Sequence, residues 1–469
     1  MKRRTVLCGA ALAVLLGLLP RAESAASMAG KGGVLSDIAP LRATLVLSLG
    51  EQIFKTSEFG AAGANRHPIF GGLPRGVIRE HQALRELLRG QGVEVHDVRD
   101  LLESAIRNAR QKGALAAWVR ETFPATAPQT AQRLDLITAD SILNLRDEHF
   151  YGKTPAGLAD PLFPGLPSMY WSRDFAISTP KGIVIGNGQY YRRALENAVA
   201  RLIFRFADPV KAFPIVFDAA AEGVYLDGGD LIVLDEKTLL LGIGNRSSRE
   251  AAVKLAQRLD LDVLGVAMPP VEKQTGLNRQ LLHLDSIFNL IDRNRVLAVP
   301  FFLEKEYSDA NPLKPFLLGL AAQTDEIRRA QPEREMSKPD DLRATVEVMP
   351  QIGWVTKYAA GTGAPTPLNL KLVDVFRQRG YQVNYVGGDR GALPMEKYLI
   401  ERAMYELRWQ GANVVQLAPG RVIAYEHNVH TNEALRRAGV EVLTFPGELL
   451  SLNNGGPHCL LMPLLRGSR

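Results

Sequence analysis

The chain has 469 residues, of which 46% are hydrophobic and 23% are charged, as in ordinary globular proteins. This composition excludes a disordered chain, a collagen-like chain and a small scaffold held by disulfides. The formal net charge is +6, and half of it belongs to residues 1–26. The charge that remains is too small to indicate nucleic-acid binding, so we expect no nucleic-acid partner.

Residues 1–26 have the three parts of a secretory signal peptide. A basic start at Lys2-Arg3-Arg4 precedes an apolar body at 6–19, and small residues follow at 24–26. The apolar body is short for a membrane span, and no later segment is long and apolar enough for one. We therefore expect an exported protein, periplasmic or secreted, and the paired arginines favour the twin-arginine route. An uncleaved membrane anchor is the alternative interpretation.

A module made of a β-hairpin, a helix and a further strand recurs along the rest of the chain. In chain order, the parts that hydrophobic spacing predicts are a strand at 44–49, a helix and strand at 81–96, a full module at 172–218, another at 229–266, a hairpin at 286–299, a helix and strand at 370–385, and a full module at 413–445. They amount to about five modules, which indicates radial repetition around an axis. Composition alone is equally compatible with a doubly wound sheet.

Two stretches interrupt these modules. Residues 101–149 have helical spacing, and residues 304–342 are charged and helix-like. We interpret both as helical insertions in a single α/β domain that extends over 35–469.

One cysteine, Cys459, remains once the signal peptide and its Cys8 are removed. It ends the sequence Gly455-Gly456-Pro457-His458-Cys459, in which the glycines and the proline predict a tight turn that presents the thiol at a strand end. A cysteine in such a turn is either a buried structural residue or a nucleophile.

Histidine and carboxylates recur at other module starts. We expect His283 and Asp285 to share one face of a strand, where the carboxylate makes the histidine a better base, although an isolated pair of this kind is usually a surface pair. Further acids follow aromatic residues at Asp174 and flank two glycines at Asp227 and Asp230. Two carboxylates can bind a planar guanidinium through paired hydrogen bonds. A thiolate can then attack the central carbon, while a histidine transfers a proton to the leaving amine.

These motifs, taken in order, resemble those of arginine deiminases in the guanidino-group-modifying, or pentein, superfamily. The resemblance covers 42–466 and is carried by His81, Arg173-Asp174, Gly228-Gly229-Asp230, Arg246-Ser247-Ser248, His283-Leu284-Asp285, Gly455-Gly456-Pro457-His458-Cys459 and Met462-Pro463-Leu464. It implies a five-module pseudo-symmetric α/β propeller with helical insertions, one of which follows the first module. It implies no metal and no cofactor.

By position, the resemblance implies that Cys459 is the nucleophile and His283 the general acid and base. Asp174 and Asp285 would hold the guanidinium. Asp227 stands where the family has a glutamate, which is longer, and we include it among the catalytic acids.

The resemblance also implies residues that bind the rest of the substrate. Asp230 belongs to this set, and Arg193 and Arg246 resemble arginines that contact the amino-acid end of the substrate or neighbouring acids. Asn454 stands where the family has an arginine that meets the substrate carboxylate. Loss of one such charge-assisted bond removes about 1.5–3 kcal/mol, enough to change which guanidine is preferred.

We therefore expect an exported hydrolase that acts on the guanidinium of arginine or a related guanidino compound through a Cys-linked amidino intermediate. It would release ammonia and a ureido product, which is citrulline if the substrate is arginine. The alternatives are an amidinotransferase and a non-catalytic exported guanidine-binding protein. A papain-like peptidase is disfavoured because the histidine precedes the cysteine. We interpret Glu426, His427 and His430 as helix-capping residues rather than a zinc site.

Overall fold

The computed structural model describes residues 33–49, 74–122, 134–143, 169–189, 191–270, 277, 280–308, 310–331, 339–452 and 455–467. The predicted signal peptide and Asn454 lie outside these residues, as do parts of both predicted insertions. Across the described ranges, no helix has the length and apolar character needed to cross a membrane.

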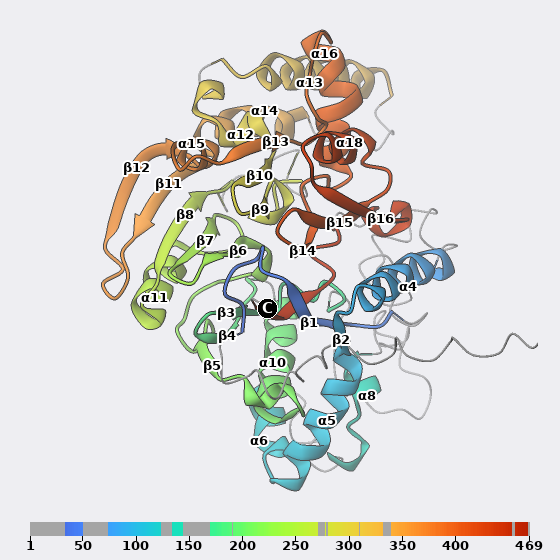
Figure 1. Cartoon of the computed structure of the whole chain (residues 1–469), viewed down its shortest axis with the longest axis vertical. Coiled ribbons are helices and arrows are strands. Elements are labelled where there is room, and N and C mark those ends of the chain that lie inside the picture. The colour runs from blue at the N-terminus through green and yellow to red at the C-terminus, as the bar shows by residue number, and fades with distance from the viewer. Residues whose placement is uncertain are drawn as a thin grey trace, which may run out of the picture.

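Five sheets surround a common axis, and each contains the same three-strand pattern (Figure 1). In every sheet the first strand pairs antiparallel with the second, and the second pairs parallel with the third. The five sets are β17 (Met462–Arg466), β1 (Leu41–Val46) and β2 (Glu94–Asp97); β3 (Ala176–Thr179), β4 (Gly182–Ile185) and β5 (Ile215–Asp218); β6 (Leu231–Asp235), β7 (Thr238–Ile243) and β8 (Asp262–Ala267); β9 (Phe288–Asp292), β10 (Arg295–Ala298) and β13 (Gln382–Tyr385); β14 (Val415–Ala418), β15 (Arg421–Tyr425) and β16 (Glu441–Phe445). The predicted five-module α/β propeller is confirmed, and the last strand of the chain closes the ring beside β1.

A helix in each module provides the crossover that parallel second and third strands require. These helices are α4 (Pro74–Gly90), α10 (Tyr191–Phe206), α11 (Arg249–Leu259), α15 (Leu372–Gln378) and α18 (Val429–Arg437). In α11 the side chain of Ser248 accepts a hydrogen bond from the backbone of Ala251 and so caps the first turn. The buried residues of this helix recur at helical spacing and face the sheet.

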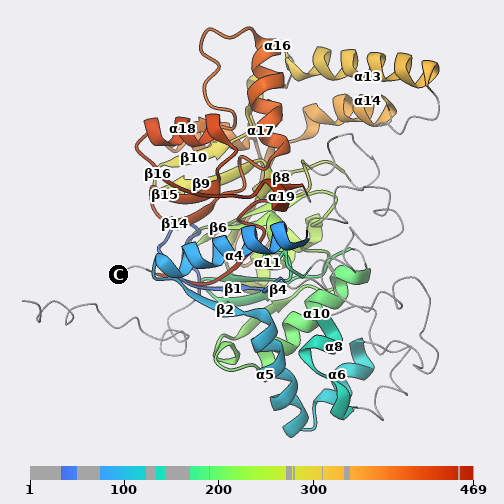
Figure 2. The same ribbon diagram turned by 90° about the vertical axis from the view of Figure 1, so that its right-hand side faces the viewer.

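The two predicted insertions lie at opposite ends of the long axis of the molecule (Figure 2). The described part of the first contains α5 (Val98–Gln111), α6 (Leu115–Thr122), η2 (Leu134–Leu136) and α8 (Ala139–Leu143), and α5 packs against α10. The second contains α12 (Pro300–Leu303), η6 (Lys305–Tyr307), α13 (Leu313–Ala330), α14 (Pro339–Val348) and η7 (Met349–Gln351). The described parts of both consist of helices.

The second insertion extends further than predicted. A hairpin of β11 (Trp354–Tyr358) and β12 (Pro365–Lys371) follows its helices, and β11 pairs with β8 to make that sheet five-stranded. The outer strand β12 is largely exposed and contains two prolines, so its sequence has little of the apolar alternation that marks a strand. The remaining elements are η3 (Val210–Ala212), η4 (Gly228–Asp230), η5 (Leu284–Ser286), α16 (Met395–Tyr398), η8 (Leu399–Ala403), α17 (Met404–Arg408) and α19 (Glu448–Ser451).

Candidate active site

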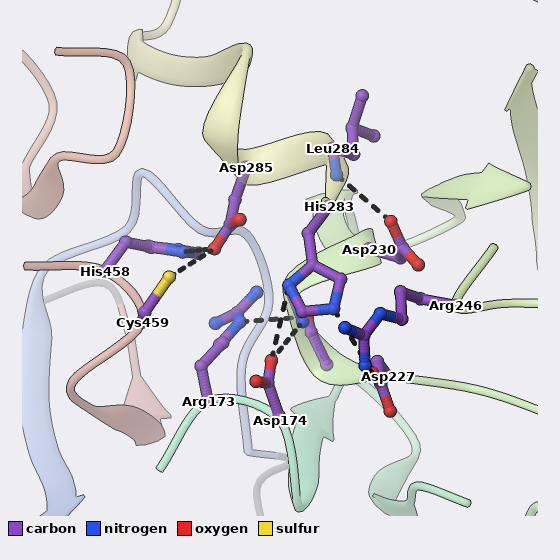
Figure 3. A network of polar contacts seen from close by, with 12 residues as sticks. Arg173, Asp174, Asp227, Asp230, Arg246, His283, Leu284, Asp285, His458 and Cys459 are labelled. Atoms are coloured by element: carbon purple, nitrogen blue, oxygen red, sulfur yellow. Dashed lines mark hydrogen bonds and ion pairs between the residues drawn. The ribbon is translucent and has the colours of Figure 1, made fainter. Parts of the chain in front are cut away.

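Polar side chains gather where the first strands of the modules begin. Asp174 precedes β3, η4 and Asp227 precede β6, and η5 with His283 precedes β9. Cys459 lies in the turn before β17. All of these side chains are buried, and Figure 3 shows them converging on one another from different modules. The radial repeat therefore assembles the site from segments that are far apart in the sequence.

His283 lies among carboxylates. Its Nε2 is 3.2 Å from Asp227 Oδ2, and its Nδ1 is 3.8 Å from Asp174 Oδ1. Burial lowers the pKa of His283, but the carboxylates of Asp174, Asp227 and Asp230 outweigh burial and raise this pKa to about 9. At neutral pH the ring is therefore a cation that can donate a proton. Although Asp227 is shorter than the glutamate that the resemblance implies, it reaches the histidine.

Gly229 makes this approach possible. A Cβ atom at this position would lie 2.5 Å from Nδ1 of His283, closer than any side chain tolerates. The backbone N–H of Gly229 also donates to Asp174 Oδ1 over 3.1 Å. The glycines between Asp227 and Asp230 thus let the histidine ring and a carboxylate contact the same backbone turn.

Asp285 contacts the cysteine rather than the histidine that precedes it in sequence. His458 Nδ1 donates to Asp285 Oδ2 over 2.8 Å, and Cys459 Sγ lies 3.7 Å from the same oxygen. Burial opposes ionisation of Asp285, but its hydrogen bond with His458 lowers the carboxyl pKa below the usual value. The prediction that His283 and Asp285 share a strand face is wrong. His283 immediately precedes η5, and Asp285 lies within it. Because a 3₁₀ helix has three residues per turn, residues two positions apart point in different directions, so the two side chains meet different partners.

The Cys459 thiol is protonated in this arrangement. Burial raises its pKa well above the usual value, and the carboxylates of Asp285 and Asp174 raise it further. A cation bound between these carboxylates would reverse their effect and favour the thiolate.

The predicted arginines contact the site carboxylates. Arg193, in the first turn of α10, lies 2.8 Å from Asp174 Oδ2 and 2.8 Å from Glu196 Oε2. Arg246 Nη1 is 3.7 Å from Asp227 Oδ2. Both arginines are thus placed at the edge of the carboxylate cluster.

Asp230 connects its own turn, η4, to Leu284 in η5 and to Ser247. Its Oδ1 accepts from the backbone N–H of Leu284 over 3.0 Å, and its Oδ2 accepts from the hydroxyl of Ser247 over 2.7 Å. Burial raises the pKa of Asp230 to about 7. The predicted substrate-binding residue Asp230 therefore joins η4 to η5, and Asn454 lies outside the described residues.

Sequence reasoning missed three residues that support the site. His458 is buried against Asp285, and Asp37 is buried 3.2 Å from the guanidinium of Arg173. Asn413 contacts the cysteine itself. Asn413 comes shortly before the first strand of its module, β14, as the other site residues precede theirs. Its position in the repeat is therefore the feature of the sequence that could have identified it.

Five repeated modules with a cysteine, a histidine and carboxylates at one end of the axis define a pentein, an α/β propeller of the guanidino-group-modifying class. Among the described residues, no group of three histidine, cysteine, aspartate or glutamate side chains is placed to hold a metal ion. The family model of arginine deiminase matches residues 73–314 and 396–466. The chain therefore belongs to the arginine deiminase family, and it is a hydrolase of that kind. Most of the second insertion falls in the stretch that the family model leaves unmatched.

Full-length relatives and solved structures are similar along most of the chain. An arginine deiminase of Mycoplasma capricolum subsp. capricolum is 27% identical over 460 residues, which cover 94% of this chain and 98% of that protein. One from Rhodococcus erythropolis is 25% identical, covering 92% and 97%. The product-bound N-terminal domain of ArgZ, a cyanobacterial arginine dihydrolase, has a TM-score of 0.45 at 12% identity, covering 90% of this chain and 97% of that one. A DDAH mutant from Pseudomonas aeruginosa complexed with citrulline has a TM-score of 0.43 at 11% identity, covering 90% and 99%.

Proposed function

We propose that this enzyme hydrolyses the guanidinium group of arginine, or of a related guanidino compound, through an intermediate linked to Cys459. The observation that carries the proposal is the arrangement of a cysteine 3.7 Å from one buried carboxylate and a histidine cation held between two others. A nucleophile, a proton donor and several anionic groups in one buried cluster suit a cationic substrate with an attackable carbon.

Unsatisfied carboxylate oxygens support the guanidinium as the bound group. Within the described part of the chain, Oδ1 of Asp227 and Oδ1 of Asp285 are buried and have no hydrogen-bond partner. A buried acceptor without a donor is costly, and a guanidinium supplies five N–H donors in one plane. Asp174 accepts from Arg193 and Gly229, and its oxygens have lone pairs left for a further donor.

The first half of the reaction would form the covalent intermediate. The bound cation lowers the pKa of the Cys459 thiol, whose proton passes to solvent. The thiolate then attacks the guanidinium carbon, and a C–S bond forms. The imidazolium of His283 donates its proton to an amino nitrogen, the C–N bond breaks and ammonia leaves.

The second half would release the product. Neutral His283 takes a proton from water while the water oxygen adds to the carbon. The C–S bond breaks, the sulfur leaves as a thiolate and the second proton of the water passes to solvent. The product is a urea that keeps the rest of the substrate, which is citrulline if the substrate is arginine.

Incubation of the purified protein with L-arginine tests this proposal. We expect ammonia and citrulline in equal amounts and the loss of both products in Cys459→Ala. Unchanged activity in that variant would remove the covalent scheme. If L-arginine gives no product, agmatine and peptidyl-arginine test whether the asparagine at position 454 has changed the preferred guanidine. No product from any of them would contradict the proposal.

Two measurements distinguish the alternative functions. An amidinotransferase would form ornithine and a new guanidino compound when an amine acceptor is added. A binding protein would bind the guanidine in calorimetry and release no ammonia.

We also propose that the protein is exported, on the strength of the signal-like sequence at 1–26. Fractionation of cells that express the full chain is expected to place a shortened form outside the cytoplasm. A full-length form that stays with the cytoplasmic fraction would contradict this.

A further inference from the structure

Asn413 holds the nucleophile at two points. Its Nδ2 lies 3.2 Å from Cys459 Sγ, and its Oδ1 accepts from the backbone N–H of Cys459 over 3.2 Å. The same Nδ2 donates to the backbone carbonyl of Asp285 over 3.2 Å. The side chain is fully buried, so these contacts exclude water from this side of the sulfur.

The hydrogen-bonding roles decide what this contact does to the sulfur. The Oδ1 atom already accepts a hydrogen bond from the backbone N–H of Cys459, which identifies the group facing Sγ as the NH₂ of the amide. An amide N–H is a donor, and a donor stabilises an anionic sulfur more than a protonated one. This contact therefore acts against the nearby carboxylate of Asp285, which disfavours the thiolate.

Gly456 provides the space that this contact needs. A Cβ atom at position 456 would lie 2.4 Å from both Cβ and Oδ1 of Asn413. Any side chain there would move the amide away from the sulfur. The second glycine before the cysteine therefore permits close contact with the start of another module, in addition to the turn that the sequence predicted.

We propose that Asn413 is a further catalytic residue, whose Nδ2 donates to the sulfur of Cys459 whenever that sulfur carries negative charge. This role rests on the proposed function, because the sulfur is anionic both before it attacks the substrate and when the product leaves. At both points a fixed donor in a dry site stabilises the charge.

The variant Asn413→Asp keeps the shape of the side chain, removes the donor and adds a negative charge beside the sulfur. It keeps an oxygen that accepts from the Cys459 backbone but replaces the NH₂ with a second oxygen. The probe is iodoacetamide, which reacts with the thiolate, and its rate of reaction with Cys459 is measured as a function of pH. We expect the rate at neutral pH to fall about tenfold to a hundredfold and the pH profile to move to higher pH. In turnover of L-arginine, kcat should fall by a similar factor while KM changes little.

Asn311→Asp is the matched control. Asn311 is also buried, donates to the backbone carbonyl of Phe301 over 2.6 Å and accepts from the N–H of Leu313 over 3.0 Å, but it lies in the second insertion. Its iodoacetamide profile should equal that of the unchanged protein. Asn413→Ala removes the donor without adding a charge, so its alkylation rate at neutral pH should fall as well. It also replaces Asn413→Asp if that variant does not fold by circular dichroism.

The two outcomes are separable from those of the proposed function. An unchanged iodoacetamide profile in folded Asn413→Asp or Asn413→Ala would overturn the role of Asn413, whatever the turnover shows. A shifted profile in a protein that releases no ammonia from any guanidine would keep the role of Asn413 in stabilising the thiolate and would instead remove the proposed hydrolysis.

Discussion

Replacement of Asp285 by asparagine is expected to make the Cys459 thiol more reactive and the enzyme less active. The Asp285 carboxylate lies 3.7 Å from Cys459 Sγ and disfavours the thiolate. Two like unit charges at that separation repel by about 4.5 kcal/mol at an effective dielectric constant of about 20. Because about 1.4 kcal/mol corresponds to a tenfold change, relief of only a third of this repulsion would raise the thiolate population tenfold.

The assay compares two rates in the same variant. The rate of Cys459 alkylation by iodoacetamide at neutral pH should rise at least tenfold in Asp285→Asn. Turnover of L-arginine should fall, because the variant has lost a charge that binds the guanidinium. Asp235→Asn makes the same substitution at the end of β6 and should change neither rate. An alkylation rate in Asp285→Asn that stays constant or falls would refute the electrostatic reasoning.

Three further predictions concern His283, the Asp37–Arg173 pair and Gly229. The value of kcat/KM should fall as the pH rises through about 9, where His283 loses its proton. Asp227→Asn should move that fall to lower pH, because it removes a carboxylate that stabilises the imidazolium. A profile that does not move would argue against His283 as the proton donor. Asp37→Asn should lower the free energy of unfolding by about 3 kcal/mol, because it leaves the buried guanidinium of Arg173 without its anionic partner. An unchanged midpoint of urea unfolding would count against a stabilising role for this pair. Gly229→Ala should abolish turnover by displacing the ring of His283. Gly319→Ala in α13 should leave kcat unchanged, because an added Cβ atom there has no neighbour within 4 Å. Equal kcat values in the two variants would contradict the steric argument.

The modules were predictable because their signals are local. Turn residues between β6 and β7 and helical spacing in α11 can be recognised within a short window of sequence. The hairpin β11–β12 was not predictable in this way, since its outer strand β12 is exposed and its inner strand β11 pairs with β8, a distant part of the chain.

The sequence pointed to residues that the structure brings together in one cluster, but their contacts were not predictable. The residues that precede the first strands could be identified by type, and the resemblance supplied their order. Which carboxylate contacts which ring depends on the η5 turn and on segments from other modules. For that reason the sequence favours a pair of Asp285 with His283, whereas the partners of Asp285 in space are His458 and Cys459.

In the proposed mechanism, the substrate becomes bonded to Cys459 and loses ammonia first. Rapid acid quench of the enzyme with L-arginine, followed by peptide mass spectrometry, would detect this adduct. We expect the peptide carrying Cys459 to gain the mass of the substrate less that of ammonia, and the adduct to disappear as citrulline forms. A gain of the amidino group alone would show that the alkylamine leaves first, and citrulline formation with no adduct on Cys459 would contradict the covalent mechanism.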